Sequence, residues 1–219
     1  MHFEILVEDI SGARLLNEVL PKICSDQDTW AIHSYKGIGG KVPQSLATSS
    51  DPSKRILLTE LPRLLRGYGN TFSRYPKEYK ASVILVVDLD DRNKVDFLND
   101  LNSILSRITP RPETRFCFAI EEGEAWLLGD IPAIKKSYPK AKDTVLFAYV
   151  NDSICGTWET LADAVYPGGA RKLKQEAYNV IGKYKYDWAA SISPNMNVDD
   201  NSSPSFNDFK STVKALSDL

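Results

Sequence analysis

Two aspartates follow the most apolar stretch of the chain. The run Ala81–Val87 reads ASVILVV and is followed by Asp88, Leu89, Asp90 and Asp91. A continuous run of β-branched residues and leucine is typical of a central parallel strand, and open α/β sheets bind ligands at the carboxyl ends of such strands. Side chains at positions i and i+2 project the same way, roughly 6–7 Å apart, so Asp88 and Asp90 could serve one metal site. The alternative is that these acids are turn and cap residues, with Asp91 capping the next helix.

Glu8 stands at the end of another apolar segment, Phe3–Glu8. If the two strands are neighbours, three carboxylates meet at one sheet edge. Crowded like charges raise the pKa of at least one acid, and a divalent cation removes that repulsion. Oxygen-only ligands favour Mg²⁺ or Mn²⁺ over zinc. The sequence therefore predicts a Mg²⁺ or Mn²⁺ site formed by Glu8, Asp88 and Asp90, which are also the expected catalytic residues.

A third group of acids follows the segment Arg115–Ile120. Glu121, Glu122 and Glu124 come directly after it, so they are expected near the same sheet edge, where one of them could bind a second cation. The alternative is a helix N-terminus rich in glutamate, because acids there interact favourably with the helix dipole. The pattern does not decide which of the three faces the site.

Strand and helix patterns alternate along the first part of the chain, which predicts an α/β fold with a parallel sheet and helices on both faces. A mostly helical extension is expected beyond it, so the chain is divided into an α/β domain, 1–130, and a helical region, 131–219. The expected strands are Phe3–Glu8, Trp30–Tyr35, Ser82–Val87 and Arg115–Ile120; the expected helices are Gly12–Cys24, Lys54–Arg66, Lys94–Arg107 and Ser205–Leu216, with a loop at Lys36–Pro52.

Composition bounds the class of protein. The 219 residues are 42% hydrophobic and 26% charged, as in an ordinary globular chain. No apolar run approaches the ~20 residues that span a bilayer, and the N-terminus lacks the basic start of a signal peptide, so a cytoplasmic protein without membrane contact is expected. The three cysteines form no metal-binding spacing and are expected to be buried thiols.

The formal net charge of −2 provides no overall basic surface, so nucleic-acid binding must depend on local patches. Two candidates are residues 54–80 and 171–185, where Lys and Arg outnumber Asp and Glu. The alternative for each is a solvated helix face. The residues predicted to contact nucleic acid are Lys36, Arg63, Arg66, Lys172 and Lys174.

The order of the acids resembles the TOPRIM fold of topoisomerases, primases and OLD-type nucleases, in which a Glu follows the first strand and D-x-D a later one. The resemblance covers residues 1–125 and implies a Rossmann-like sheet. It also implies a further acidic ligand after the next strand, a role that falls here on Glu122 or Glu124. One departure is Asp9, which stands where these proteins commonly have Gly.

A closer resemblance spans nearly the whole chain. The segments Val7–Gly12, Asp88–Asp91, Ile120–Asp130 and Ser203–Phe206 are similar to a bacterial TOPRIM-like family of uncharacterised function. This resemblance implies a neighbouring ATPase of the AAA/ABC type and an antiviral, abortive-infection setting. The last segment is interpreted as a helix N-cap and hydrophobic anchor, with Ser205 in the site as the alternative.

These observations predict a metal-dependent nuclease that acts on DNA or RNA, with an ATPase as partner. The alternative is a non-catalytic regulatory subunit of that ATPase. A topoisomerase or primase reaction would need a tyrosine or zinc domain, which the sequence does not show. The chain also lacks a P-loop ending in G-K-[ST] and the G-x-S-x-G of many hydrolases.

Overall fold

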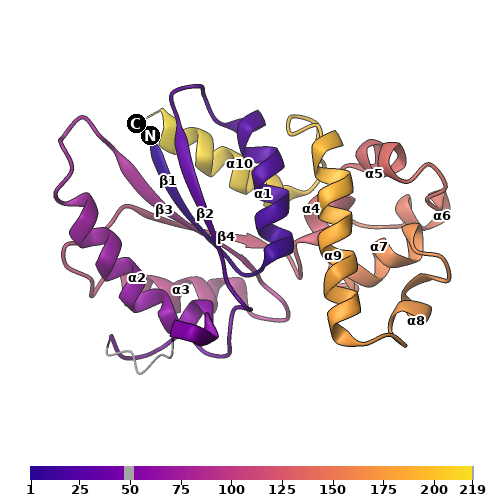
Figure 1. Cartoon of the computed structure of the whole chain (residues 1–219), viewed down its shortest axis with the longest axis horizontal. Helices are drawn as coiled ribbons and strands as arrows, with labels where there is room; N and C mark the ends of the chain where they lie inside the picture. The colour runs from indigo at the N-terminus through magenta and orange to yellow at the C-terminus, as the bar shows by residue number, and fades with distance from the viewer. Residues whose placement is uncertain (47–51, 219) are drawn as a thin grey trace.

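The sheet has four parallel strands. The computed structural model describes residues 1–46 and 52–218. Its strands are β1 (His2–Val7), β2 (Thr29–Ser34), β3 (Ala81–Asp88) and β4 (Thr114–Ala119), in the order β2-β1-β3-β4. The chain runs outward from β1 to β2 and then returns across β1 to β3 (Figure 1). The carboxyl ends of β1 and β3 are therefore the topological switch point of the sheet.

Helices cover both faces of this sheet, which confirms the predicted α/β class with parallel strands (Figure 1). On one side lie α1 (Ile10–Ile23) and α10 (Pro204–Ser217), and on the other α2 (Leu57–Phe72) and α3 (Lys94–Leu105). The remaining helices form a region beside the sheet: α4 (Glu124–Leu128), α5 (Ile131–Ser137), α6 (Asp143–Leu146), α7 (Thr157–Val165), α8 (Gly169–Leu173) and α9 (Tyr178–Ile192).

Strand alternation divides the core into two clusters. On β3, Ile84 and Val86 pack toward α1 and α10, whereas Val83, Leu85 and Val87 pack toward α2 and α3. Both sets are almost fully buried. This is the reason for the unbroken apolar run of β3, since a central parallel strand is covered on both faces.

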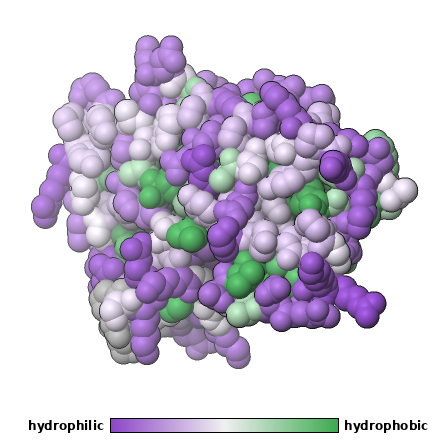
Figure 2. Space-filling model, turned by 45° about the vertical axis from the view of Figure 1, so that its right-hand side comes forward, coloured by the Kyte–Doolittle hydropathy of each residue, from purple (hydrophilic) through white to green (hydrophobic). Residues whose placement is uncertain are grey.

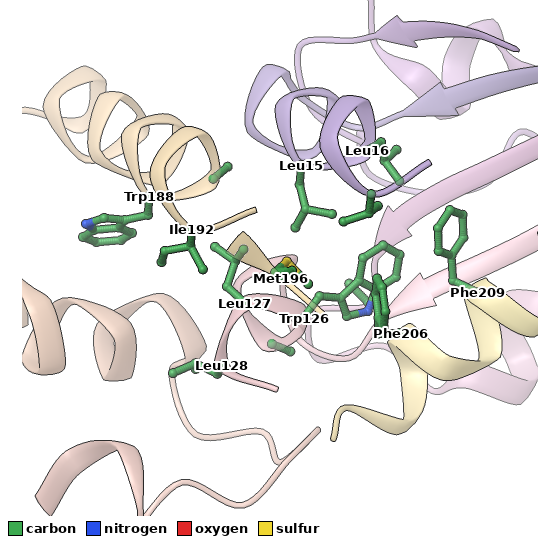
Figure 3. Packing of buried hydrophobic residues seen from close by; sticks show 14 of the residues in the cluster. Leu15, Leu16, Trp126, Leu127, Leu128, Trp188, Ile192, Met196, Phe206 and Phe209 are labelled. Atoms are coloured by element: carbon green, nitrogen blue, oxygen red, sulfur yellow. The ribbon is translucent and has the colours of Figure 1, made fainter. Parts of the chain in front are cut away.

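Aromatic side chains join the helical region to the sheet (Figure 3). The ring of Trp126 lies 5.6 Å from that of Phe206 and 5.1 Å from that of Phe209, both on α10. In the same view Trp188 and Ile192 of α9 approach from the other side. Trp126, Leu127 and Leu128 are core residues. Residues on both sides of position 130 therefore share one hydrophobic cluster.

Local polar residues set the ends of the helices. Asp9 caps α1 by accepting the N–H of Gly12, and Asn93, not Asp91, caps α3. Asp91 was the wrong choice because Asn93 accepts N–H groups from the first turn of the helix. Ser203 caps α10, as predicted.

Three other expectations meet the structure differently. The helix expected from Lys54 begins at Leu57, and residues 47–51 of the expected loop lie outside the described part. Ser205 is buried against Trp126 and Asp152, away from the carboxylates of the sheet edge. Only Cys117 is a buried thiol, because Cys24 is partly exposed and Cys155 is exposed on a loop.

The surface is mainly hydrophilic. On the face shown in Figure 2, apolar residues form several separate patches rather than one continuous area. Scattered exposed apolar side chains are normal for folded chains. Among the described residues, no helix is both long and apolar enough to cross a bilayer.

Two glycines of α2 should respond in opposite ways to alanine. A Cβ at Gly69 would lie 1.9 Å from the carbonyl oxygen of Pro110, whereas a Cβ at Gly67 meets no heavy atom within 4 Å. We expect Gly69→Ala to lower the free energy of unfolding by about 2–4 kcal/mol through this clash. Gly67→Ala should raise it by about 0.5–1 kcal/mol, since alanine favours the helix. Urea unfolding of both variants measures the difference, and equal effects would contradict the packing of α2 on the segment at Pro110.

Candidate metal centre

The carboxylates of Glu8 and Asp88 meet at the switch point of the sheet. Glu8 directly follows β1, Asp88 is the last residue of β3, and the two strands are hydrogen-bonded neighbours. The backbone N–H of Asp88 donates to Oε2 of Glu8 at 3.3 Å. The predicted convergence of these two acids is therefore seen in the structure, at the position where doubly wound sheets bind ligands.

Glu8 lies close to other acids at this edge of the sheet. Burial, followed by repulsion from Asp90 and Asp9, raises the pKa of Glu8 from 4.5 to about 7, although hydrogen bonds from the backbone of Asp88 and Ile38 oppose the shift. The pKa of Asp88 also rises well above its usual value, through burial and then through the charge of Glu8. Both acids thus hold protons more readily than free carboxyl groups unless a cation balances them.

Asp88 and Asp90 do not share one face, contrary to the expectation from strand alternation. Regular strand geometry ends at Asp88, and Asp90 has a left-handed backbone with φ of 51°. Its side chain pairs with Arg92, whose guanidinium also donates to the carbonyl of Gly39. Asp88 instead lies among Glu8, Lys185 and Glu124. Glu8 is the acid that interacts with both aspartates.

The three glutamates after β4 have different roles. Glu121 turns away and accepts the backbone N–H groups of Cys155, Gly156 and Thr157 at the start of α7. Burial alone would raise the pKa of Glu121, but these hydrogen bonds, together with the Thr157 hydroxyl, lower it below its usual value. Glu122 and Glu124 face the interior, so they are the two candidates for a further ligand.

Lys185 is the residue that sequence reasoning missed, because it was counted within a solvent-exposed basic patch. Its Nζ lies 3.3 Å from Oε1 of Glu122 and 3.2 Å from Oε2 of Glu124. Only 17% of its side chain is exposed. A signal was present in the sequence, since Lys185 occupies the helical stripe formed by Ile181, Trp188 and Ile192, where an apolar residue is expected.

Lys185 and the acids around it shift one another's pKa values. Burial disfavours the charged form of Lys185, yet the pKa of this amine is raised well above its usual value by Glu124, Asp88, Glu122 and Asp9. Burial raises the pKa of Glu122 to about 7 and also raises the pKa of Glu124. The charge of Lys185 lowers both pKa values and so opposes these shifts. One ammonium therefore interacts with four carboxyl groups, too few positive charges to balance them if all four were ionised.

A small cavity lies inside this group. Its volume is about 30 Å³, and its polar lining consists of Glu8, Asp9, Asp88, Glu124 and Lys185 together with Ser11, which is room for a water or a small ion. Gly12 permits the close approach of α1, because a Cβ there would lie 2.7 Å from Cγ2 of Val7. The cavity is thus built from β1, β3, β4, α1, α4 and α9, and most of the other residues that line it are apolar.

The carboxylate oxygens of this site suit a hard divalent cation, but they are not arranged around one common position. Carboxylate oxygens are the ligands that Mg²⁺ and Mn²⁺ prefer, and in the described part of the chain the buried Oε2 of Glu124 has only the ion pair with Lys185 as a polar partner. Within residues 1–46 and 52–218, however, no group of three His, Cys, Asp or Glu side chains is already arranged to hold a metal. A shared ion therefore requires side chains to move, Asp90 from Arg92 in particular.

The predicted nucleic-acid contacts fall into two separate places. Arg63 and Arg66 are on α2, and Lys172 and Lys174 are at α8, toward opposite ends of the long axis (Figure 1). Arg63 pairs with Glu60, Lys174 pairs with Glu159, and Arg66 donates to the carbonyl of Leu46. Lys36 is exposed just beyond the carboxyl end of β2.

Neutralising Glu8 should stabilise the metal-free protein at alkaline pH. A folded-state pKa of about 7 lies above the unfolded one, so the stability gained by protonating Glu8 is present below about pH 4.5 and lost as the pH rises through about 7. Glu8→Gln cannot titrate. The gain in free energy of unfolding of Glu8→Gln over the wild type should therefore be about 1–3 kcal/mol larger at pH 8 than at pH 5.

Urea unfolding in EDTA at both pH values measures this difference. Glu78→Gln, at an exposed position, is the matched control and should behave like the wild type at either pH. A Glu8→Gln variant that loses stability equally at both pH values would show that the carboxylate of Glu8 is not under charge repulsion.

One family model matches the chain. It covers residues 7–214 and is described as a domain of unknown function, DUF4276. Searches of curated proteins and of solved structures found no match. The family description names no reaction, ligand or partner, so the chemistry of the site carries the functional argument.

Proposed function

The chain belongs to the DUF4276 family of unknown function, and we propose from its carboxylate cluster that it is a divalent-metal-dependent nuclease. The observation that carries this proposal is the convergence of Glu8 and Asp88 at the switch point, with too few cations to balance the acids around them. In this proposal Mg²⁺ or Mn²⁺ balances the charge.

The bound cation would supply Lewis-acid polarisation of a phosphodiester and activation of a water molecule. The residues of the chain have separate tasks. Glu8, Asp88 and Asp90 hold the ion, and Glu124 or Glu122 contributes a further oxygen. Arg92 lies beside Asp90 and is suited to neutralise a substrate phosphate once Asp90 turns away from it. Lys185 keeps Glu122 and Glu124 in place.

The proposed substrate is nucleic acid, DNA or RNA, and the proposed partner is an ATPase of the AAA/ABC type, as the TOPRIM-like resemblance implies. Both are expected in the cytoplasm, in an antiviral system. The chain has no P-loop of its own, so ATP-driven control would come from the partner. Co-expression with the product of a neighbouring ATPase gene, followed by co-purification, tests this association.

A second function is favoured by a specific observation. The ion pairs of Lys185 already occupy Glu122 and Glu124, and the described residues contain no ready set of three metal ligands. These facts fit a non-catalytic regulatory subunit of the same ATPase, in which the buried ion pairs stabilise the fold.

Metal binding and cleavage separate the two functions. Purified protein is titrated calorimetrically with Mg²⁺ and Mn²⁺, and then incubated with plasmid, single-stranded DNA and total RNA, with and without each metal. The nuclease proposal expects saturable metal binding and metal-dependent cleavage of at least one substrate. Absence of both, with the ATPase partner also present, would leave the regulatory function.

A further inference from the structure

A second hollow lies on the helical region, away from the carboxylates. It is formed where the end of α7 and the start of α8 meet α9 (Figure 1), and its volume is about 340 Å³. Four aromatic side chains line it, together with one cation and one acid: Tyr138, Tyr166, Tyr184, Trp188, Lys172 and Asp187. This size and composition suit a flat ring with a charged group attached.

The aromatic rings form a floor and a rim. Trp188 is 2% exposed and is the floor, and the ring of Tyr184 lies 6.2 Å from it. Tyr166 meets Tyr184 edge to face at 4.8 Å, and both tyrosines are partly exposed. Partly exposed rings held by a rigid neighbour are the surfaces on which nucleobases stack.

The charges around the hollow favour an anion. Asp187 is neutralised by Lys183 on the next turn of α9, whereas the described residues provide no ion pair for Lys172. Lys174, two positions away, is paired with Glu159. An apolar peptide would gain nothing from Lys172, and an uncharged sugar would leave its ammonium without an anionic partner. A nucleotide uses both the rings and the ammonium.

We propose that this hollow binds a nucleotide, with the base stacked on Tyr184 and bordered by Tyr166, whose ring is nearly perpendicular to that of Tyr184, and with the phosphate on Lys172. The ligand is either a free nucleotide or an unpaired base of a nucleic-acid strand, since both carry the same ring and phosphate. The site is independent of the proposed metal chemistry. Tyr184 and Lys185 are neighbours on α9, but Lys185 faces the carboxylate cluster whereas Tyr184 lines the hollow.

Fluorescence of 2-aminopurine tests the proposal, because this base loses emission when it stacks on an aromatic ring. The probes are 2-aminopurine nucleoside, its 5′-monophosphate and a four-nucleotide single strand that contains it, all in EDTA so that neither metal nor cleavage is involved. The wild type should quench the monophosphate or the strand saturably. Tyr184→Leu should weaken binding by about 10-fold or more, while Tyr184→Phe keeps it.

Lys172→Ala should weaken binding of the monophosphate by several-fold but leave the nucleoside unchanged, a pattern that a merely structural lysine would not produce. Tyr178→Leu, on the exposed start of α9, is the matched control and should bind like the wild type. Equal affinity for monophosphate and strand would indicate a free nucleotide, and tighter binding of the strand would indicate nucleic acid.

Two outcomes would overturn the proposal. One is no saturable quenching of any probe by the wild type. The other is that the two single variants, Lys172→Ala and Tyr184→Leu, both bind the probes like the wild type. If the melting temperature shows that Tyr184→Leu is unfolded, unchanged binding by Lys172→Ala alone overturns the proposal. Failure of the nuclease assay would leave this test unaffected.

Discussion

Asp90→Asn is expected to reduce metal-dependent cleavage by about 100-fold or more while the protein stays folded. Loss of a group that only supports a metal ligand already costs about 10–100-fold, and this substitution removes the charge of a proposed ligand. The backbone should be unchanged, because asparagine tolerates the left-handed conformation that Asp90 adopts. The measurements are the cleavage rate at saturating Mn²⁺ and the rise in melting temperature caused by the metal, which should shrink in the variant.

Asp91→Asn is the matched control, because Asp91 is the exposed neighbour of Asp90 and caps no helix. It should cut and bind metal like the wild type. An Asp90→Asn protein that melts lower, responds to metal normally and still cuts would assign Asp90 to the fold, where its pairing with Arg92 would be its role.

Lys185→Met should destabilise the protein by about 3 kcal/mol at pH 8. Methionine fills a similar volume, but Glu122 and Glu124 lose their cation, and removing one partner of a buried pair leaves an uncompensated charge. The loss should diminish as the pH falls through about 7, since the pKa of Glu122 already lies near that value and protonated carboxyl groups need no partner. Urea unfolding at pH 8 and pH 5 measures both effects.

The double variant Lys185→Met with Glu124→Gln isolates the ion pair from packing. It should recover much of the lost stability, because the deepest carboxylate is then neutral. Lys183→Met, whose ion pair is on the exposed side of α9, should change stability little. Equal losses in the single and double variants would mean that Lys185 acts through packing of its methylene chain.

The four strands and the class of the fold were predictable because they depend on local patterns. The run Val83–Val87 of β3 has no polar residue before Asp88, and that pattern is produced by burial on both faces of a parallel strand. The position of Glu8 after β1 followed from the same reasoning. Strand pairing then brought Glu8 and Asp88 together, as strands of one parallel sheet have their carboxyl ends at one edge.

The orientation of the other acids depended on contacts that no local pattern contains. Asp90 leaves the face of Asp88 because a single left-handed residue changes the direction of the chain after the strand. Glu121 turns to the backbone of α7, more than thirty residues away in sequence. Neither event has a periodic signature, since each is decided by a partner brought close only by folding.

Lys185 shows the division most clearly. The sequence predicted a mostly helical region beyond residue 130 without bounds for α9, and given that helix, Lys185 lies in line with Ile181, Trp188 and Ile192 on one stripe. Only the tertiary structure decided that this stripe faces the carboxyl edge of the sheet, about sixty residues from its acidic partners in the chain. A buried ammonium is stable only beside carboxylates, so its place depended on Glu122 and Glu124 being brought to it by the fold.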